Sequence, residues 1–232
     1  MLNELFVRYL KQERELGFRE IFVDLPDIQN TLESPAEPAR KLQIIYESEK
    51  GCQRCLLGKT RKSFVFGEGN PEARLMFIGE APGFEEDQQG RPFIGPAGQL
   101  LNKMISAMGL TREEVYIANI IKCRPPKNRN PLPEEIESCR RLIHQQIDTV
   151  KPEFLCCLGL VAARTLVGSD LSLSQLRGRF YKFKGIPLMV TYHPSALLRT
   201  PSWKKEAWQD LQMLMGQMAL LSPAVQSTPI TH

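Results

Sequence analysis

The sequence lacks any long apolar segment. No run of about 18 apolar residues, the minimum for a membrane-spanning helix, interrupts the chain. Its first residues, MLNELFVRYLKQEREL, mix charged side chains among the apolar ones, which a secretory signal does not tolerate. We therefore expect a soluble, cytoplasmic protein without a secretory leader.

A strong excess of charge of either sign is also missing. The formal net charge is +4, which permits a polyanionic partner without requiring one. Two local groups of basic residues are more informative, because basic loops that flank a site would suit phosphates. The groups are Lys122, Arg124, Lys127 and Arg129 in one segment, and Arg177, Arg179, Lys182 and Lys184 in another.

The cysteines give no sign of a disulfide framework. In a chain that we expect to be cytosolic, six cysteines indicate metal binding, redox chemistry or simple burial. Cys52 and Cys55 form a CxxC pattern, and Cys123 and Cys139 lie in a second polar region. Such a set can make a four-thiolate site for zinc or for iron, and spacing alone does not separate the two. Cys156 and Cys157, in the apolar run FLCCLG, are expected to be core thiols.

Length and composition predict one globular domain with irregular flanks. Residues 1–23 have apolar positions at helical spacing and predict an amphipathic helix. Residues 24–40 contain three prolines and predict a linker, and residues 222–232 predict a disordered tail. The domain itself therefore spans residues 41–221.

Within the domain, short apolar runs alternate with longer helical segments, which is the pattern of an α/β fold with a parallel sheet. The predicted strands are 74–79, 115–121, 154–159 and 187–192, and the predicted helices are 97–109, 133–151, 160–168 and 203–221. Polar or turn residues follow each strand. Open α/β sheets bind ligands at that carboxyl edge.

A segment rich in glycine and proline follows the first predicted strand. Residues 79–98, GEAPGFEEDQQGRPFIGPAG, contain five glycines and three prolines, so their backbone can approach a ligand closely. Because loops of this length are usually functional or disordered, we favour a ligand-binding loop over a plain surface connection.

Two further segments complete a recognisable set. They are ANIIKCRPPKNRNP at 118–131 and HPSALLR at 193–199. Together with 79–98, they resemble the motifs of the family 4 uracil-DNA glycosylases. The family pattern for the first motif is GE, then Ala or Gly, PG, two variable residues, ED, two more, and GxPFxGxAGxLL, and the match extends through Leu100 and Leu101. Any one motif would be weak evidence, but three in the family's order are not. The resemblance covers roughly residues 50–215.

The resemblance implies a fold and an activity. The fold would be a three-layer α/β/α domain around a central four-stranded, mainly parallel sheet. The enzyme would flip uracil out of DNA and hydrolyse its N-glycosidic bond, leaving an abasic site, in base-excision repair of deaminated cytosine. The resemblance further implies that the protein is a monomer from a prokaryote, that it is associated with the nucleoid, and that its partner is uracil-containing DNA.

The resemblance also implies a 4Fe-4S cluster. Cys52, Cys55, Cys123 and Cys139 match the cluster-binding positions of the family, which decides for iron over zinc. We expect a structural cluster that ties the segment before the first strand to the basic loop after the second.

Three residues correspond to catalytic positions of the family. Asn119 would donate to uracil O4 and accept from N3–H, a pattern that cytosine reverses. His193 would hydrogen-bond O2, where negative charge develops. Family 1 enzymes position the attacking water with an aspartate where this chain has Ala81. Glu80 is therefore the candidate for stabilising the oxocarbenium-like sugar and for positioning the water.

Other residues correspond to substrate contacts. Phe93 resembles the aromatic side chain that stacks on the flipped base. Glu86 would lie near uracil C5 and reject the methyl group of thymine, and Asp87 would be a supporting carboxylate. Backbone N–H groups around Glu80 and Ala81 would donate to O2.

The HPSALLR segment would contact the DNA itself. Ser195 would bind a phosphate, and Arg199 would meet the minor groove. Leu197 or Leu198 would enter the gap that the flipped base leaves.

Two alternatives compete with this interpretation. A relative in the same superfamily crosslinks to abasic DNA through a histidine in an inserted basic loop, but no histidine lies between Cys123 and Cys139. A non-catalytic DNA-binding module with a redox-sensing cluster is the second alternative. One observation argues against this second alternative. The chain has all four candidate residues for catalysis and base stacking: Glu80, Phe93, Asn119 and His193.

Overall fold

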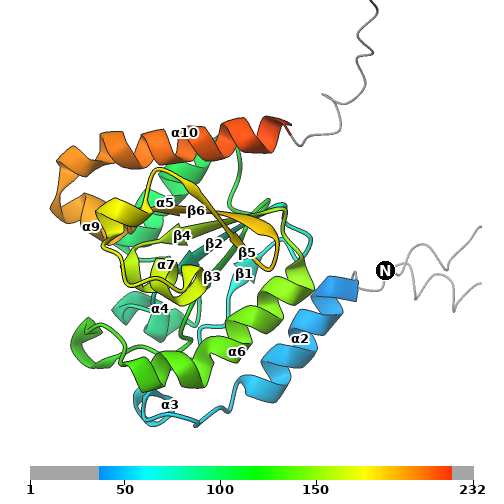
Figure 1. Cartoon of the computed structure of the whole chain (residues 1–232). Coiled ribbons are helices and arrows are strands. Elements are labelled where there is room, and N and C mark those ends of the chain that lie inside the picture. The colour runs from blue at the N-terminus through cyan, green and yellow to red at the C-terminus, as the bar shows by residue number, and fades with distance from the viewer. Residues whose placement is uncertain (1–36, 221–232) are drawn as a thin grey trace, which may run out of the picture. The chain divides into compact units, whose positions relative to one another are not determined.

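Six strands form one mixed sheet in the computed structural model, which describes residues 37–220 (Figure 1). Their order across the sheet is β1-β3-β2-β4-β6-β5. The strands are β1 (Glu68–Gly69), β2 (Leu75–Gly79), β3 (Tyr116–Asn119), β4 (Phe154–Leu158), β5 (Phe180–Phe183) and β6 (Ile186–Thr191). The four adjacent strands β3, β2, β4 and β6 pair in parallel, whereas β1 and β5 are antiparallel at the edges.

The prediction of a four-stranded sheet was incomplete. The four predicted strands correspond to β2, β3, β4 and β6, and the structure adds the two edge strands. β1 has only two residues, and β5 is half-buried or exposed along its length, so neither has a continuous apolar run. β5 joins β6 through Lys184 and Gly185, which have φ values of 49° and 84°. Two successive positive φ angles are typical of a type I′ hairpin.

The helices of the described residues include all four that the sequence predicted. These correspond to α5 (Pro96–Ala107), α6 (Pro133–Val150), α7 (Leu160–Val167) and α10 (Lys204–Leu220). The structure adds α2 (Glu37–Glu49), α3 (Leu57–Thr60), α4 (Phe84–Gln89), α8 (Leu173–Leu176), α9 (Pro194–Arg199) and the 3₁₀ helices η2 (Pro126–Asn128) and η3 (Pro201–Trp203).

The domain limits differ slightly from the prediction. Residues 37–40, which we assigned to the linker, form the first turn of α2. The expected N-terminal helix, the remainder of the linker and the C-terminal tail lie outside the described residues. Within the described range, no helix has the length and apolar character to cross a membrane.

Helices cover both faces of the sheet, which gives three layers. One buried cluster joins the sheet to α2, α6 and α7, and the other joins it to α5, α9 and α10. β4 shows how the strands supply both clusters, because Leu155 and Cys157 enter the first and Phe154 and Cys156 the second. Cys156 and Cys157 are both 0% exposed, so the prediction of core thiols is confirmed.

Candidate active site

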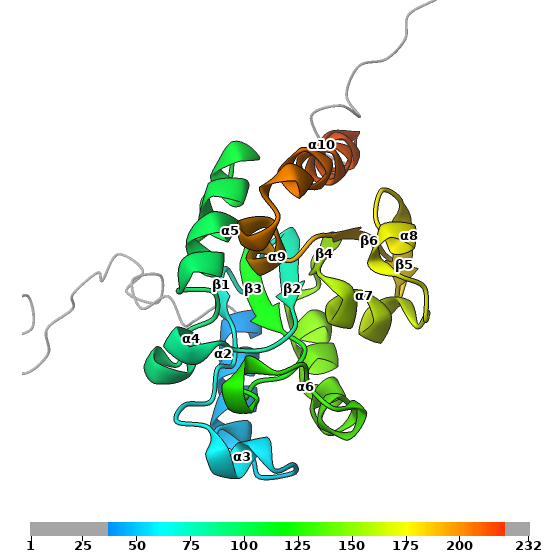
Figure 2. The same ribbon diagram turned by 90° about the vertical axis from the view of Figure 1, so that its left-hand side faces the viewer.

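A pocket of about 570 Å³ lies where the loops after four parallel strands meet. Parallel strands end at the same edge of a sheet, so distant parts of the chain converge there. In Figure 2, α4, α9 and the loop that precedes α6 surround the ends of β2 and β3. Eight residues that the sequence assigned to the site line this pocket: Glu80, Ala81, Glu86, Phe93, Asn119, His193, Ser195 and Arg199.

Asn119, the last residue of β3, presents an unsatisfied amide oxygen. The residue is 2% exposed, and its Oδ1 has no hydrogen-bond partner among the described residues. Its partner across the sheet, Gly79, leaves room for this side chain. A Cβ at that glycine would lie 2.5 Å from Asn119 Oδ1 and 2.4 Å from Phe93 Cζ. Because an unpaired buried acceptor is costly, Asn119 Oδ1 is suited to accept a hydrogen bond from a ligand.

His193 is held as a neutral hydrogen-bond donor. It is the N-cap of α9, and its Nδ1 accepts a hydrogen bond from the backbone N–H of Ser195 at 3.2 Å. The Ser195 hydroxyl lies 2.8 Å from the same nitrogen. An Nδ1 that accepts carries no proton, so the neutral ring has its proton on Nε2. Burial, with a smaller effect of Arg199, lowers the pKa of His193 to about 4.

Phe93 is buried beside His193 in a strained backbone conformation. Their ring centroids are 5.5 Å apart, and Phe93 has a φ of 50°. Arg112 donates to the backbone carbonyls of Pro92 at 2.5 Å and Phe93 at 3.1 Å. A Cβ at Gly98 would lie 1.9 Å from the Phe93 carbonyl oxygen, so only glycine permits this packing. The position of the ring is therefore fixed by its own backbone.

Glu86 holds the pocket loop together. Its carboxylate accepts hydrogen bonds from the backbone N–H groups of Gly83 at 3.1 Å, Ile94 at 3.0 Å and Gly95 at 2.9 Å. The carboxylate of Glu80, in contrast, makes no hydrogen bond to the described residues, and burial raises its pKa. Of these two pocket carboxylates, Glu80 is the one free to act on a substrate.

The structure does not place Asp87 or Leu197 on the pocket. Asp87 is buried and accepts hydrogen bonds from the backbone N–H groups of Lys62 at 2.9 Å and Ser63 at 3.2 Å. Leu197 is 1% exposed and belongs to the core, whereas Leu198 is 45% exposed. Only Leu198 of the two leucines is therefore accessible to DNA.

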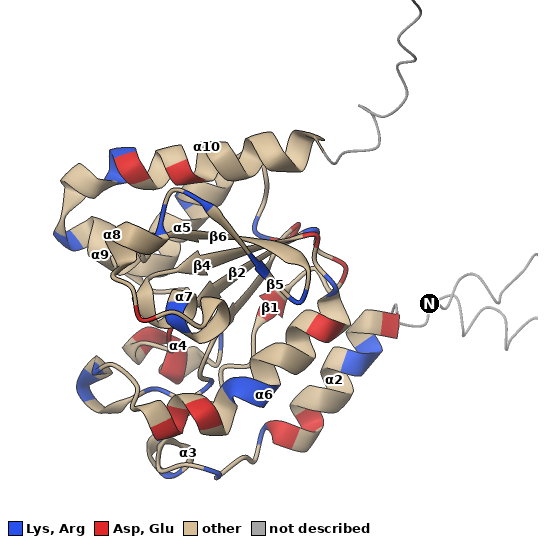
Figure 3. Ribbon diagram, in the orientation of Figure 1, with Lys and Arg blue, Asp and Glu red and all other residues tan. Residues whose placement is uncertain are grey.

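The two basic groups differ in their relation to the pocket. Figure 3 shows Lys and Arg on the loop between β3 and α6, where Arg129 lines the pocket. Lys122, which we expected among phosphate contacts, is instead fully buried. Its Nζ donates to the Asn119 carbonyl at 2.7 Å and to Gln146 Oε1 at 2.5 Å. In the second group, Lys184 pairs with Asp148 at 2.7 Å, outside the pocket lining.

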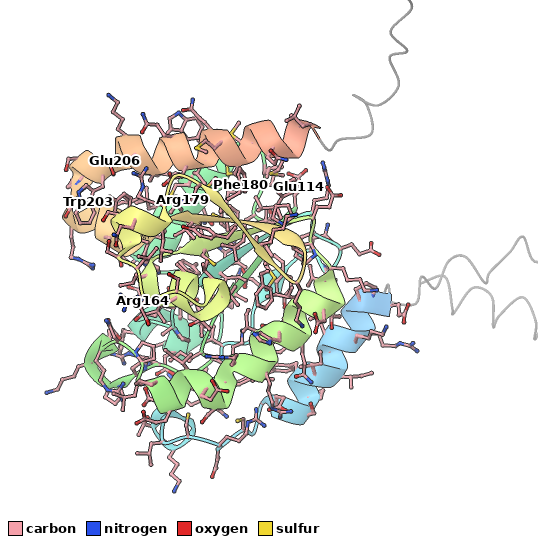
Figure 4. The ribbon with its side chains drawn as sticks, viewed as in Figure 1. Glu114, Arg164, Arg179, Phe180, Trp203 and Glu206 are labelled. Carbon is pink, nitrogen blue, oxygen red and sulfur yellow. The ribbon has the colours of Figure 1, made fainter. Side chains whose placement is uncertain are left out.

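The residue before His193 is anchored by the start of α10. Tyr192 stacks on Trp203 with ring centroids 4.8 Å apart and donates to Glu206 Oε2 at 2.9 Å. Figure 4 labels Trp203 and Glu206 at the end of α10 that lies near α9. Arg177 binds both Glu206 and Asp210. Arg177 is thus part of this support for His193, not a phosphate contact as we had expected.

Residues 66–212 match the family model of the uracil DNA glycosylase superfamily. The chain belongs to this superfamily. It is 42% identical over 183 residues to a Type-4 uracil-DNA glycosylase of Pyrobaculum aerophilum, covering 75% of this chain and 93% of the relative. The Type-4 enzyme of Archaeoglobus fulgidus is 40% identical, covering 75% and 91%. A Type-5 uracil-DNA glycosylase of Thermus thermophilus is 33% identical, covering 56% and 68%.

Four cysteines of this uracil DNA glycosylase superfamily member gather outside the pocket. Cys123 is buried in the core cluster on which Cys52, Cys55 and Cys139 pack. Burial raises the pKa of Cys123, and the nearby Cys139 and Cys55 act in the same direction. Burial likewise raises the pKa of Cys139, and Cys52 and Cys55 add to this effect. Cys139 therefore lies within electrostatic range of the other three thiols.

A single metal ion would need several ligands gathered at one point. In the part of the chain that the structure describes, no three His, Cys, Asp or Glu side chains are placed to hold one. A four-iron cluster makes a different demand, because each of its irons takes one thiolate and the sulfurs need not converge on one point. The donor set of four free cysteines fits such a cluster.

Sequence reasoning missed Arg112 and Gly79 as supports of the pocket. Arg112 lies outside all three motifs, and nothing in its neighbourhood distinguishes it from a surface arginine. Gly79 was noticed only as the end of the predicted strand 74–79 and the first residue of the glycine-rich segment 79–98. Its close approach to Asn119 and Phe93 appears only when β2 and β3 are paired.

Proposed function

We propose that the protein is a uracil-DNA glycosylase that flips uracil out of DNA and hydrolyses its N-glycosidic bond in base-excision repair. Its superfamily and its similarity to Type-4 enzymes support this function. The observation that carries it is the buried, unpaired Oδ1 of Asn119 in the same pocket as the Nε2–H of His193. Uracil offers a donor at N3 and acceptors at O2 and O4, which these groups complement.

Recognition follows from this pairing. Asn119 Oδ1 accepts from uracil N3–H, and the amide nitrogen donates to O4. Cytosine has no proton at N3 and carries an amino group at C4, so it would leave the buried amide unpaired. Phe93 stacks on the base, and its fixed backbone limits where the base can lie.

Bond cleavage places negative charge on the departing uracil. His193 donates from Nε2 to O2, and this hydrogen bond strengthens as charge develops in the transition state. Since its pKa is lowered to about 4, the ring is neutral at physiological pH. His193 therefore stabilises the anion by hydrogen bonding, without transferring a proton.

The sugar becomes positively charged in the same step. Glu80 lines the pocket without a hydrogen bond to the described residues, so its carboxylate can face the oxocarbenium-like sugar and orient the attacking water. Ala81, which also lines the pocket, has no side chain that could hold this water. Water positioning therefore falls to Glu80.

We also propose that Cys52, Cys55, Cys123 and Cys139 hold a 4Fe-4S cluster. When bound, the cluster supplies covalent links between the segment that follows α2, the loop that follows β3, and α6. That loop reaches the pocket at Arg129. The cluster would therefore fix a DNA-facing wall and take no part in the chemistry.

Release of uracil from DNA tests the proposal. The full chain is incubated with end-labelled oligonucleotides that contain a single deoxyuridine, either single-stranded or opposite guanine, and alkaline cleavage reveals abasic sites. We expect cleavage at deoxyuridine and none in matched oligonucleotides with thymidine or deoxycytidine at that position. Folded protein that leaves the deoxyuridine intact would contradict the proposal.

A further inference from the structure

An exposed aromatic ring stands at the rim of the pocket. Phe84 begins α4, lines the pocket and is 55% exposed. The backbone just before it is held, because Glu86 accepts a hydrogen bond from the N–H group of Gly83, and Glu86 also binds the N–H groups of Ile94 and Gly95 across the pocket loop. The ring therefore projects from a rigid turn toward the mouth of the pocket.

An arginine from the loop after β3 contacts this ring. The guanidinium carbon of Arg124, in the loop after β3, lies 5.0 Å from the Phe84 ring centroid, a cation–π contact. Arg124 Nε also donates to Asn128 Oδ1 at 2.7 Å, and Asn128 lines the pocket. Arg124 covers part of the ring, but more than half of Phe84 remains exposed.

This combination matches the chemistry of single-stranded nucleic acid binding. Proteins bind unpaired bases on aromatic side chains, often with arginine beside them, because every base has a face that can stack. When uracil occupies the pocket, its sugar and phosphates lie at the mouth, and the flanking nucleotides begin there. The ring of Phe84 is thus within the region that those nucleotides must cross.

We propose that Phe84, backed by Arg124, is a stacking site for the base of a nucleotide that flanks the uracil. This inference rests on the proposed glycosylase function, since it places uracil in the pocket. A flanking base can reach the ring only if it leaves its own helical stack. The contribution of Phe84 is therefore larger for single-stranded DNA than for duplex DNA.

A cycle of changes in enzyme and substrate tests the site. Three single-stranded oligonucleotides each carry one deoxyuridine. In the first, adenine flanks the deoxyuridine on both sides. In the other two, an abasic tetrahydrofuran spacer replaces the 5′ adenine or the 3′ adenine. Dissociation constants and single-turnover rates are measured for wild type, Phe84→Ala and Phe84→Trp. Phe84 is 55% exposed, so we expect both variants to fold as wild type does, and circular dichroism checks this.

We expect Phe84→Ala to weaken binding of the adenine-flanked DNA roughly tenfold, as loss of one stacked base would. One of the two spacers should weaken wild-type binding by a similar factor, and combining that spacer with Phe84→Ala should add little. Phe84→Trp should retain the wild-type affinity. Ile44→Ala, at a position 61% exposed on α2 and outside the pocket lining, is the matched control and should change nothing.

Two results would overturn the inference. One is a Phe84→Ala variant that binds all three oligonucleotides as wild type does. The other is that the losses of binding free energy caused by Phe84→Ala and by each spacer add in full when the two are combined. Failure of the glycosylase function itself would look different. The wild-type protein would then release no uracil from any of the three oligonucleotides.

Discussion

The guanidinium of Arg112 donates a hydrogen bond to the backbone carbonyl of Phe93 at 3.1 Å, at a residue whose φ is 50°. A left-handed conformation costs a non-glycine residue free energy, so surrounding contacts must hold it in place. Arg112 supplies such contacts to two successive carbonyls while it is itself held by Glu68 at 2.7 Å. The orientation of the Phe93 ring therefore depends on a residue outside the pocket lining.

We predict that Arg112→Met lowers the single-turnover rate of uracil excision by roughly tenfold or more, equivalent to about 1.4 kcal/mol in the barrier. It should also raise the inhibition constant of free uracil, because the ring that binds the base is no longer fixed. Arg91→Met is the matched control. Arg91 pairs with the same Glu68 at 2.8 Å but lies 59% exposed, and its loss should leave both quantities unchanged. Equal effects of the two substitutions would show that Glu68, and not the Phe93 carbonyl, matters.

The state of His193 leads to a second prediction. Its pKa falls from 6.5 to about 4 in the folded protein, so the unfolded chain takes up a proton first as the pH drops. The free energy of unfolding therefore decreases as the pH falls from about 6.5 to about 4. In the folded protein, the neutral form of His193 persists to near pH 4. Only three histidines are present, so ¹⁵N NMR can follow each ring, with His193→Gln for assignment. A His193 signal that is protonated on both nitrogens at pH 6 would contradict the assignment.

Asn119 provides a test that separates function from stability. We predict that Asn119→Ala lowers the excision rate by about 10²- to 10³-fold, as loss of a transition-state hydrogen bond does. Its melting temperature should stay near or above that of wild type, because the substitution removes a buried acceptor that has no partner within residues 37–220. Thermal unfolding and single-turnover assays on the same preparation measure both. A large loss of stability would mean that Asn119 has mainly a structural role.

The four cysteines lead to a prediction about metal content. Freshly purified protein should be brown and contain about four irons per chain. Cys123→Ser should lose iron, colour and folding stability together, because a cluster joins separate segments. Cys156→Ser is the matched control: that thiol is buried in β4 and packs in the core, so the variant should keep its iron. Stoichiometric zinc without iron after anaerobic purification would contradict the proposed 4Fe-4S cluster.

The sequence predicted the four central strands because their signals are local, whereas the resemblance to the family supplied most of the eight site residues that line the pocket. A continuous apolar run identifies β2, β3, β4 or β6, and polar residues that follow such runs collect at one edge. β1 and β5 escaped prediction because an edge strand that is partly exposed has no such run. The burial of Cys156 and Cys157 was predicted from their apolar run, but the burial of two other residues was not. Lys122 is fully buried although Lys127 and Arg129 of the same basic group are exposed, and Leu197 is buried although Leu198 is exposed.

Substitution of Glu80 is the most direct test of the chemistry. Glu80 is the pocket carboxylate that we assign to the sugar and the water, and burial raises its pKa. Glu80→Gln removes the charge at nearly constant shape, so it isolates the electrostatic contribution. We predict that the variant keeps its fold, colour and affinity for DNA while its single-turnover rate falls by roughly 10²-fold or more.

The control for Glu80→Gln is the same change at Glu113, an exposed residue outside the pocket lining. Glu113→Gln alters the net charge equally, so any general effect on attraction to DNA appears in both variants. A fall in rate that is confined to Glu80→Gln then reports on chemistry. If Glu80→Gln cuts at the wild-type rate, the carboxylate has no part in the mechanism. Cleavage would then depend on the neutral His193, on backbone donors of the loop after β2 and on a water that other groups hold.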